Sequence, residues 1–255
     1  MHPNLVIATR AARKAGDIIV RSLYRLGDLT IQEKQHNDYV TEIDLKAEQA
    51  IVEILQASFP NDSFLTEEQG EIWGADRDTI WVIDPIDGTL NFIHGFPHFA
   101  ISIARKANGR VEQGLIFNPV SQDLFTAAWG EGATLNDRRI RVSQRTKLKG
   151  TLVATNTPRM ADAKGLHQKV LEKLVPEVGA VRRTGSTALD LAFVAAGYLD
   201  GFLCDHFQEW DVAAGILLVR EAGGLVTDLK GSDAILESGT LAASNPKLLR
   251  YLVSL

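Results

Sequence analysis

The sequence predicts a layered α/β or α+β fold, and two observations carry that prediction. In some segments apolar residues recur at helical spacing, and in others short apolar runs lie between turn residues, as strands do. The two kinds of segment alternate along 255 residues, a length ample for a large core. Because no repeat or long linker separates them, we expect one unit over residues 1–255, in approximate halves 1–145 and 146–255.

The first half is expected to begin with two helices and to continue as strands. Residues 4–25 place apolar side chains on one helical face. A second helix is expected from Thr41, its N-cap, with Asp44 placed to complete a capping box, and it ends before Pro60. The expected strands, separated by turn residues, are Ser63–Thr66, Ile80–Ile83, Phe99–Ala104, Gly114–Asn118 and Leu124–Ala128, and a turn is expected over Trp129–Ala133.

The second half alternates between strands and helices to its end. Apolar runs bounded by glycine, asparagine and charged residues predict strands at Thr151–Thr155, Gly201–Cys204, Leu225–Asp228 and Thr240–Ala243. Helical spacing predicts helices at Ala161–Leu174, Ser186–Ala196, Val212–Glu221 and Pro246–Leu252.

Composition excludes several classes of protein. A formal net charge of −5 argues against non-specific nucleic-acid binding, although Arg182-Arg183 is a local basic pair. The single cysteine, Cys204, excludes an internal disulfide and a cysteine-rich zinc module. The sequence has no apolar targeting segment and no long uncharged span, so we expect a reduced, cytoplasmic protein without a membrane helix.

The most informative segment is an apolar run that meets two carboxylates, Asp84 and Asp87, followed at once by Gly88 and Thr89. We expect a buried strand that stops at Pro85, because proline cannot continue a ladder. The two carboxylates would repel each other there unless a cation lay between them, which predicts a hard-metal site. Gly88 and Thr89 then offer backbone N–H groups and a hydroxyl to an anion.

Two further carboxylates lie at the ends of predicted elements. Glu67 follows a short strand, and Asp211 opens a helix at its positive end. If the three segments converge, they form an all-oxygen pocket, which suits Mg²⁺, Mn²⁺ or Ca²⁺ rather than zinc. Taken singly, Glu67 and Glu68 also fit a solvent-exposed pair, and Asp211 also fits a simple N-cap.

Together these segments resemble the inositol monophosphatase family of magnesium-dependent, lithium-sensitive phosphatases over nearly the whole chain. The motifs that carry the resemblance are Asp38–Asp44, Leu65–Glu68, Trp81–Phe92 and Trp210–Gly224, in that order. The first residues and Ala11–Gly16 are most similar to the bacterial SuhB-type branch. The resemblance implies an α+β fold, a layered αβαβα sandwich whose mixed, mostly antiparallel sheets lie between helix layers.

The resemblance also implies a set of metal ligands. Glu67, Asp84 and the carbonyl of Ile86 would hold one Mg²⁺, and Asp84, Asp87 and Asp211 would hold a second. A third, weaker ion near Glu67 is usual in such enzymes, which gives two to three Mg²⁺ ions per site. Mn²⁺ is expected to substitute for Mg²⁺, and Ca²⁺ and Li⁺ are expected to inhibit.

The implied reaction is direct attack by water on a phosphate monoester. Asp44 and the Thr89 hydroxyl would orient and deprotonate that water, and Glu67 belongs to the same catalytic set. The sequence has no Ser-His or Cys-Arg nucleophile motif, so we expect no phospho-enzyme. The residues expected to contact the substrate are Ile86, Asp87, Gly88, Thr89, Arg183 and Asp211.

Several positions leave substrate specificity open. Lys34 corresponds to a lysine on a mobile loop in relatives, or is a solvated loop lysine. Cys204 stands where many relatives have a glutamate that binds inositol hydroxyls, and a thiol is a poor acceptor. Asp205 lies next to it, offset by one residue on the predicted strand. Thr187, beside Ser186, occupies a position that is often alanine.

Two classes of function remain. The first is hydrolysis of inositol 1-phosphate or a related polyol or sugar phosphate by a homodimer, in inositol metabolism and phosphatidylinositol phosphate biosynthesis. Nucleotide 3′-phosphate and histidinol phosphate are alternative substrates. The second, implied by the SuhB-type branch, is binding to the transcription machinery in antitermination and ribosome biogenesis, through Arg182, Arg183 and the basic face of the first helix. Neither membrane attachment nor strong nucleic-acid binding is expected.

Overall fold

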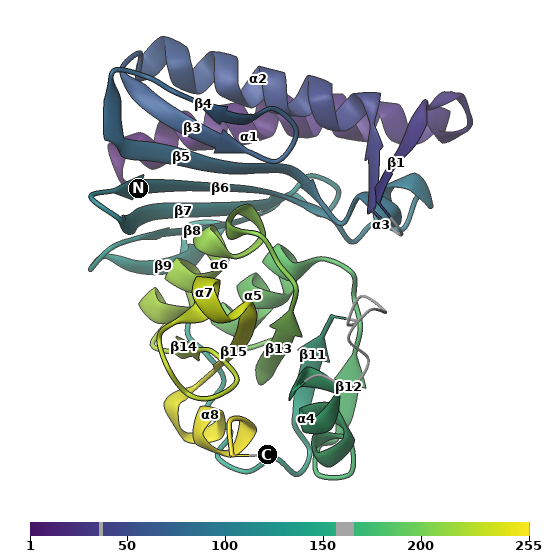
Figure 1. Cartoon of the computed structure of the whole chain (residues 1–255), viewed down its shortest axis with the longest axis vertical. Coiled ribbons are helices and arrows are strands. Elements are labelled where there is room, and N and C mark those ends of the chain that lie inside the picture. The colour runs from purple at the N-terminus through teal and green to yellow at the C-terminus, as the bar shows by residue number, and fades with distance from the viewer. Residues whose placement is uncertain (36–37, 157–165, 255) are drawn as a thin grey trace.

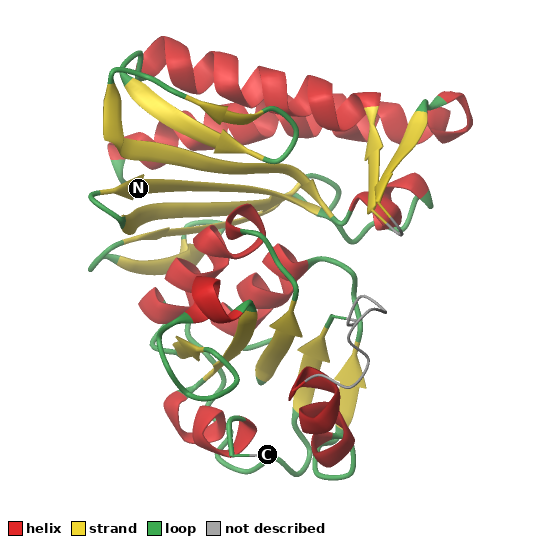
Figure 2. Cartoon of the chain, viewed as in Figure 1, coloured by secondary structure: helices red, strands yellow, loops and turns green. Residues whose placement is uncertain are grey.

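The computed structural model describes residues 1–35, 38–156 and 166–254, and helix and sheet layers alternate in it as α, β, α, β and α (Figures 1 and 2). The larger sheet has the strand order β10 (Arg138–Arg139), β9 (Gly132–Leu135), β8 (Asp123–Ala128), β7 (Arg110–Asn118), β6 (Ala100–Ala107), β5 (Asp76–Asp87), β3 (Asp62–Thr66) and β4 (Gly70–Ile72). The smaller sheet has the order β12 (Ala180–Arg182), β11 (Leu152–Thr155), β13 (Gly201–Asp205), β15 (Thr240–Ser244) and β14 (Leu225–Thr227).

The sheets are mixed and mostly antiparallel, as the resemblance implies. Within the larger sheet β3 and β5 are parallel, and within the smaller sheet β11 is parallel to β12 and β13. The other neighbouring strands of the two sheets are antiparallel. The predicted αβαβα sandwich is therefore confirmed.

Helices cover three levels of this sandwich. The outer layer on the larger sheet is α1 (Pro3–Ser22) and α2 (Glu42–Ser58), and the layer between the sheets is α5 (Thr187–Ala195) and α6 (Glu209–Glu221) (Figure 1). The outer layer on the smaller sheet contains α4 (Leu166–Leu174) and α8 (Pro246–Leu252). No described helix has both the length and the apolar character needed to cross a membrane.

Three apolar clusters fill the four contacts between the layers, because the cluster around α5 and α6 reaches both sheets. The cluster under α1 and α2 includes Phe64 and Trp81, and the one around α5 and α6 includes Phe125 and Phe202. A third, which includes Leu203, lies between the smaller sheet and its outer helices. Full burial of one such side chain contributes about 1.5–3 kcal/mol, so these clusters hold the layers in place.

The predicted helix starts are close to the observed ones. Thr41 caps α2: its hydroxyl accepts the amide of Ile43 at 3.1 Å, and Asp44 Oδ2 accepts the Thr41 amide at 2.8 Å, which completes the predicted capping box. The first helix ends at Ser22 and continues as a 3₁₀ helix, η1 (Leu23–Asp28). The helix expected at Ala161–Leu174 is described only from Leu166, because residues 161–165 lie outside the described part.

Strand β5 corrects one expectation, because it does not stop at Pro85. It runs on to Asp87, and its register with β6 shifts between Asp84, which lies opposite Ser102, and Asp87, which lies opposite Ala100. Three steps on β5 therefore match two on β6, as in a β-bulge. Proline lies inside this irregular stretch, where the regular ladder is interrupted.

The elements that the sequence did not predict are all short. They are β1 (Ile31–Gln35), β2 (Asp38–Thr41), β4, β9, β10, β12, α3 (Thr89–Ile93) and α7 (Ile235–Ser238). None exceeds five residues, so each offers few positions to a periodic pattern, although equally short strands such as β11 and β14 were predicted. Strand β9 starts inside the turn expected at Trp129–Ala133.

Candidate active site

The parallel pairing of β3 and β5 brings the first two carboxylate segments to one edge of the larger sheet. Thr66 lies opposite Ile83, and the amide of the next residue, Glu67, donates to the Ile83 carbonyl at 3.2 Å. Glu67 therefore leaves β3 beside Asp84, and the two side chains share a hydrogen bond. The carboxyl ends of parallel strands meet in this way because both chains run in the same direction.

A buried serine brings the third segment to the same edge. Ser102 on β6, opposite Asp84, donates from its hydroxyl to the carbonyl oxygen of Trp210 at 3.0 Å. The next residue, Asp211, is in the first turn of α6, where its Oδ2 accepts the Gln208 amide at 2.8 Å in a capping box. Gln208, and not Asp211, is therefore the N-cap, so the simple N-cap interpretation of Asp211 is wrong. Asp211 is the third helical residue, where it completes the capping box and also reaches the carboxylate group.

Three acidic side chains converge at this edge. One carboxylate oxygen from each of Asp84, Asp87 and Asp211 lies within 4.8 Å of the other two. Asp84 is 2% exposed; burial, and then repulsion from Glu67, Asp87 and Asp211, raises its pKa well above the ordinary value. Buried like charges at this separation are costly without a cation, and oxygen donors alone suit a hard divalent ion. The donor set therefore fits Mg²⁺.

Asp87 accepts hydrogen bonds from the N-terminal end of α5. The Ser186 hydroxyl and the Ala188 amide (2.7 Å) donate to its Oδ2, and the Thr187 amide donates to Oδ1 at 3.3 Å. Burial raises the pKa of Asp87 to about 6, although these hydrogen bonds act in the opposite direction. The sequence-predicted residues Ser186 and Thr187 thus lie against Asp87, and Ser186 also caps α5.

Asp44 and Thr89, predicted as a pair, are in contact. The Thr89 hydroxyl lies 3.2 Å from Asp44 Oδ1 and 3.1 Å from the Ile86 carbonyl oxygen, so it can donate to either. The other Asp44 oxygen accepts the Thr41 hydroxyl at 2.6 Å as well as its amide. Burial raises the pKa of Asp44 to about 6, which places a carboxylate that exchanges protons near neutral pH beside the site.

The segment before α5 passes next to Gly88. Gly88 has a φ of +100°, and a Cβ there would lie 3.1 Å from the carbonyl oxygen of Gly185. Asn91 Nδ2 ties the same segment down by donating to the Thr184 carbonyl at 2.9 Å. Arg183, which precedes Thr184, is exposed. The structure therefore brings together the Gly88–Thr89 corner, which is predicted to bind phosphate, and the segment that carries Arg183.

Three positions that were predicted to bear on substrate specificity, Cys204, Asp205 and Lys34, have different surroundings. Cys204 is fully buried; burial, and then repulsion from Asp205 and Asp211, raises the pKa of its thiol. Asp205 ends β13, and its carbonyl accepts Asn156 Nδ2 at 2.5 Å. Lys34 lies in β1 rather than in a loop, and its side chain is outside the described part.

Two residues that position the site were not found from the sequence. Glu48 lies one helical turn after Asp44 on the buried face of α2 and accepts two amides from the Glu67 turn. Its four-residue spacing from Asp44 was the available signal. Ser102 is an ordinary-looking serine in a strand, and no signal marks it.

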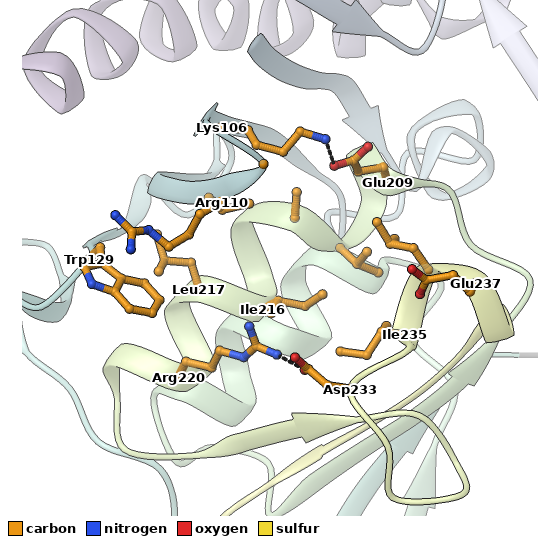
Figure 3. A pocket seen from close by; sticks show the side chains of 15 residues that line it. Lys106, Arg110, Trp129, Glu209, Ile216, Leu217, Arg220, Asp233, Ile235 and Glu237 are labelled. Atoms are coloured by element: carbon orange, nitrogen blue, oxygen red, sulfur yellow. Dashed lines mark hydrogen bonds and ion pairs between the residues drawn. The ribbon is translucent and has the colours of Figure 1, made fainter. Parts of the chain in front are cut away.

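A separate cavity of about 300 Å³ lies along the length of α6, lined by residues from Glu209 to Arg220 (Figure 3). Its rim carries two ion pairs, Lys106–Glu209 at 2.6 Å and Arg220–Asp233 at 2.5 Å, and Arg110 lies 4.6 Å over the Trp129 ring. Asp84, Asp87 and Asp211 are not among its lining residues. The cavity is therefore distinct from the carboxylate site.

Comparison with known proteins finds relatives in both sequence and structure. The model of the inositol monophosphatase family matches residues 1–254. A protein of Pseudomonas aeruginosa named Nus factor SuhB is 48% identical over 259 aligned positions, covering 100% of this chain and 96% of its own. The crystal structure of extragenic suppressor protein suhB from Bartonella henselae has a TM-score of 0.96 and 43% identity, with 98% and 96% of the two chains covered. The inositol monophosphatase of Anabaena has a TM-score of 0.86 and 35% identity, with 98% and 93% covered.

Proposed function

The chain belongs to the inositol monophosphatase family, and from that membership we propose that it is a magnesium-dependent phosphomonoesterase acting on inositol 1-phosphate or a related small polyol or sugar phosphate. The observation that carries the proposal is the convergence of Asp84, Asp87 and Asp211 beside the Asp44–Thr89 pair. Metal-ligand oxygens and a proton acceptor are the two parts that hydrolysis of a phosphate monoester by water needs.

The proposed ligands are side chains on three different elements. Asp84, Asp87 and Asp211 would hold the ions, with Glu67 and the Ile86 carbonyl completing the set. Bound there, Mg²⁺ neutralises the phosphate dianion, acidifies water and stabilises the leaving oxygen. We propose two to three ions per site, replaceable by Mn²⁺ and opposed by Ca²⁺ and Li⁺.

The chain's own groups supply orientation and proton transfer. The Asp44 carboxylate, fixed by Thr41, accepts a proton through the Thr89 hydroxyl or directly from the attacking water. Backbone N–H groups at Gly88, the N-cap of α3, and at Thr89, its first residue, orient the phosphate. Arg183 lies on the exposed segment beside this corner and contacts the substrate or a second subunit.

The test is phosphate release from a panel of small monoesters, with and without Mg²⁺. The panel contains inositol 1-phosphate, fructose and glycerol phosphates, nucleotide 3′-phosphates and histidinol phosphate. We expect Mg²⁺-dependent release, fastest with a polyol or sugar ester, and loss of release in Asp211→Asn. The absence of release from every ester at saturating Mg²⁺ would refute the proposal. Titration with LiCl and size-exclusion chromatography test the proposed lithium inhibition and homodimer.

A second function is favoured by the relatives' names, since the relatives at 45–48% identity from Pasteurella multocida and Pseudomonas aeruginosa are both named Nus factor SuhB. We propose that this chain also binds the transcription machinery, in the cytoplasm, through the surface that carries Arg182 and Arg183, both exposed. A catalytically inactive Asp87→Asn chain that rescues a deletion strain would favour this role. Rescue by the wild-type chain alone would favour catalysis.

A further inference from the structure

Glu48 is a fully buried carboxylate to which the proposed reaction gives no part. It lies on α2, four residues after Asp44, so both acids project from the same helix face toward the site. A glutamate is rarely this buried unless its charge is compensated. Burial raises the pKa of Glu48, and hydrogen bonds from the Glu67 turn act in the opposite direction.

Two of the partners of Glu48 are consecutive backbone amides, and the side chains of Thr66 and Gln69 also donate to it. The Glu68 amide donates to Oε2 at 2.8 Å, and the Gln69 amide donates to Oε1 at 3.0 Å. Each oxygen thus holds one backbone N–H group, and such bonds to a carboxylate are stronger than those between neutral groups. The contact joins α2 to a segment twenty residues along the chain.

These two amides belong to the turn that carries Glu67. Thr66 on β3 lies opposite Gly70 on β4, so residues 67–69 form the hairpin loop between the two strands. Gly70 has a φ of +74°, which suits the residue that closes a three-residue loop. Glu67 is therefore held by the hydrogen bond from its own amide to the Ile83 carbonyl, and the two residues after it are held by Glu48.

We propose that Glu48 is a positioning residue for the metal site: its carboxylate fixes the 67–69 turn so that the Glu67 side chain is held against Asp84. The inference rests on the proposed function only in assigning Glu67 as a metal ligand. Asp44 and Glu48 then have different roles on the same face of α2. Asp44 contacts Thr89, and Glu48 fixes the 67–69 turn.

The variant Glu48→Gln tests this role, because an amide keeps one acceptor oxygen but turns N–H donors toward the second backbone N–H. Mg²⁺ binding is measured by calorimetry on the whole chain without substrate. We expect the dissociation constant to rise about tenfold to a hundredfold, as when other outer-shell partners of metal ligands are removed. At saturating Mg²⁺ the kcat should fall much less than the half-saturating Mg²⁺ concentration rises.

Amide exchange supplies a second readout that needs no metal. In the metal-free chain, the Glu68 and Gln69 amides should be protected, and Glu48→Gln should speed their exchange. Two controls separate positioning from general effects. Glu53→Gln removes an exposed glutamate of the same helix, and Val52→Ala loosens its buried face. Neither control should change Mg²⁺ affinity or the exchange of these two amides.

The outcomes separate this proposal from the proposed function. Unchanged Mg²⁺ affinity in Glu48→Gln, or a loss no larger than in Val52→Ala at equal Tm, overturns the positioning role. Weakened binding in a chain that hydrolyses none of the esters supports the positioning role and refutes the phosphatase. If Glu48→Gln does not fold, Glu48→Asp carries the same test, because it withdraws the carboxylate by one methylene. An Asp variant with wild-type affinity would also overturn the role.

Discussion

Asp84 and Asp87 lie three residues apart on one strand and are both buried, yet their surroundings differ. Asp87 is surrounded by donors: the Ser186 hydroxyl and the amides of Thr187 and Ala188. Asp84 accepts the Ile86 amide at 2.9 Å, but its strongest charged neighbours are Glu67, Asp87 and Asp211. The protein therefore compensates part of the charge of Asp87, whereas the charge of Asp84 faces other carboxylates.

The difference shows two ways in which the fold arranges the carboxylates of the proposed metal site. The α5 side is preorganised, because donors hold Asp87 whether or not a cation is bound. The Asp84 side is a cluster of like charges and stores an unfavourable interaction that a divalent ion relieves. Substitution of each aspartate should therefore have the same effect on catalysis and opposite effects on stability.

The largest expected effect is the loss of catalysis, which should be the same for substitution of either aspartate. Asp84→Asn and Asp87→Asn each remove a proposed ligand, and a metal contributes several kcal/mol to the transition state, so kcat should fall by about 10³-fold or more. Phosphate release at saturating Mg²⁺ measures it, with the exposed Asp233→Asn as the matched control. Activity within tenfold of wild type in both variants would remove the site from the reaction.

Asp44 extends the comparison to a carboxylate that is held by donors but is not a proposed ligand. Asp44→Asn keeps the Thr41 contacts but cannot accept a proton, so kcat should fall by about 10²–10⁴-fold. Mg²⁺ affinity, measured by calorimetry, should stay close to wild type. An unchanged kcat would exclude Asp44 from proton transfer, and a matching loss of Mg²⁺ affinity would make it a ligand instead.

The opposite effects on stability appear in the metal-free protein. Asp84→Asn removes a charge repelled by its neighbours, so its free energy of unfolding should rise, or stay equal, at pH 8. Asp87→Asn replaces an acceptor of three donors, so its free energy of unfolding should fall by about 1–3 kcal/mol. Denaturant unfolding with EDTA measures both. Changes of the same sign would contradict the contrast between the two aspartates.

The sequence predicted a layered fold and the acids, and the family resemblance implied the sandwich, but some of the residues that support the acids were missed. Periodicity predicted the long helices and strands, and the motif around Asp84 and Asp87 predicted where oxygens would gather. It did not predict that β5 continues past Pro85, because a bulge depends on the partner strand. Nor did it predict Glu48 or Ser102, since each acts through a backbone atom of a distant segment.

Asp44 and Asp87 both contribute to the effect of pH on metal-free stability. Burial raises the pKa of each from 3.8 to about 6, so the native state binds more protons than the unfolded state between these values. The resulting stability is fully present below about pH 3.8 and is lost as pH rises through about 6. On the proposed function Mg²⁺ binds the charged form of the cluster, so the rise in Tm that Mg²⁺ produces should grow from pH 5 to 7.5. A Mg²⁺-induced rise in Tm that is equal at both pH values would contradict the pKa shift of Asp87.

The smallest expected effect isolates one donor on the preorganised side. Ser186→Ala removes the hydroxyl that binds Asp87 Oδ2, while the Ala188 amide to the same oxygen remains. The free energy of unfolding should fall by about 1 kcal/mol, partly because α5 loses its N-cap. Mg²⁺ affinity should fall by about tenfold, the lower end for an outer-shell partner. The matched control is Ser244→Ala, which removes another buried hydroxyl that donates to a backbone carbonyl, Asp200 O, so it should cost similar stability and leave Mg²⁺ affinity unchanged. Equal Mg²⁺ affinities in the two variants would show that the α5 donors stabilise the fold without preorganising Asp87.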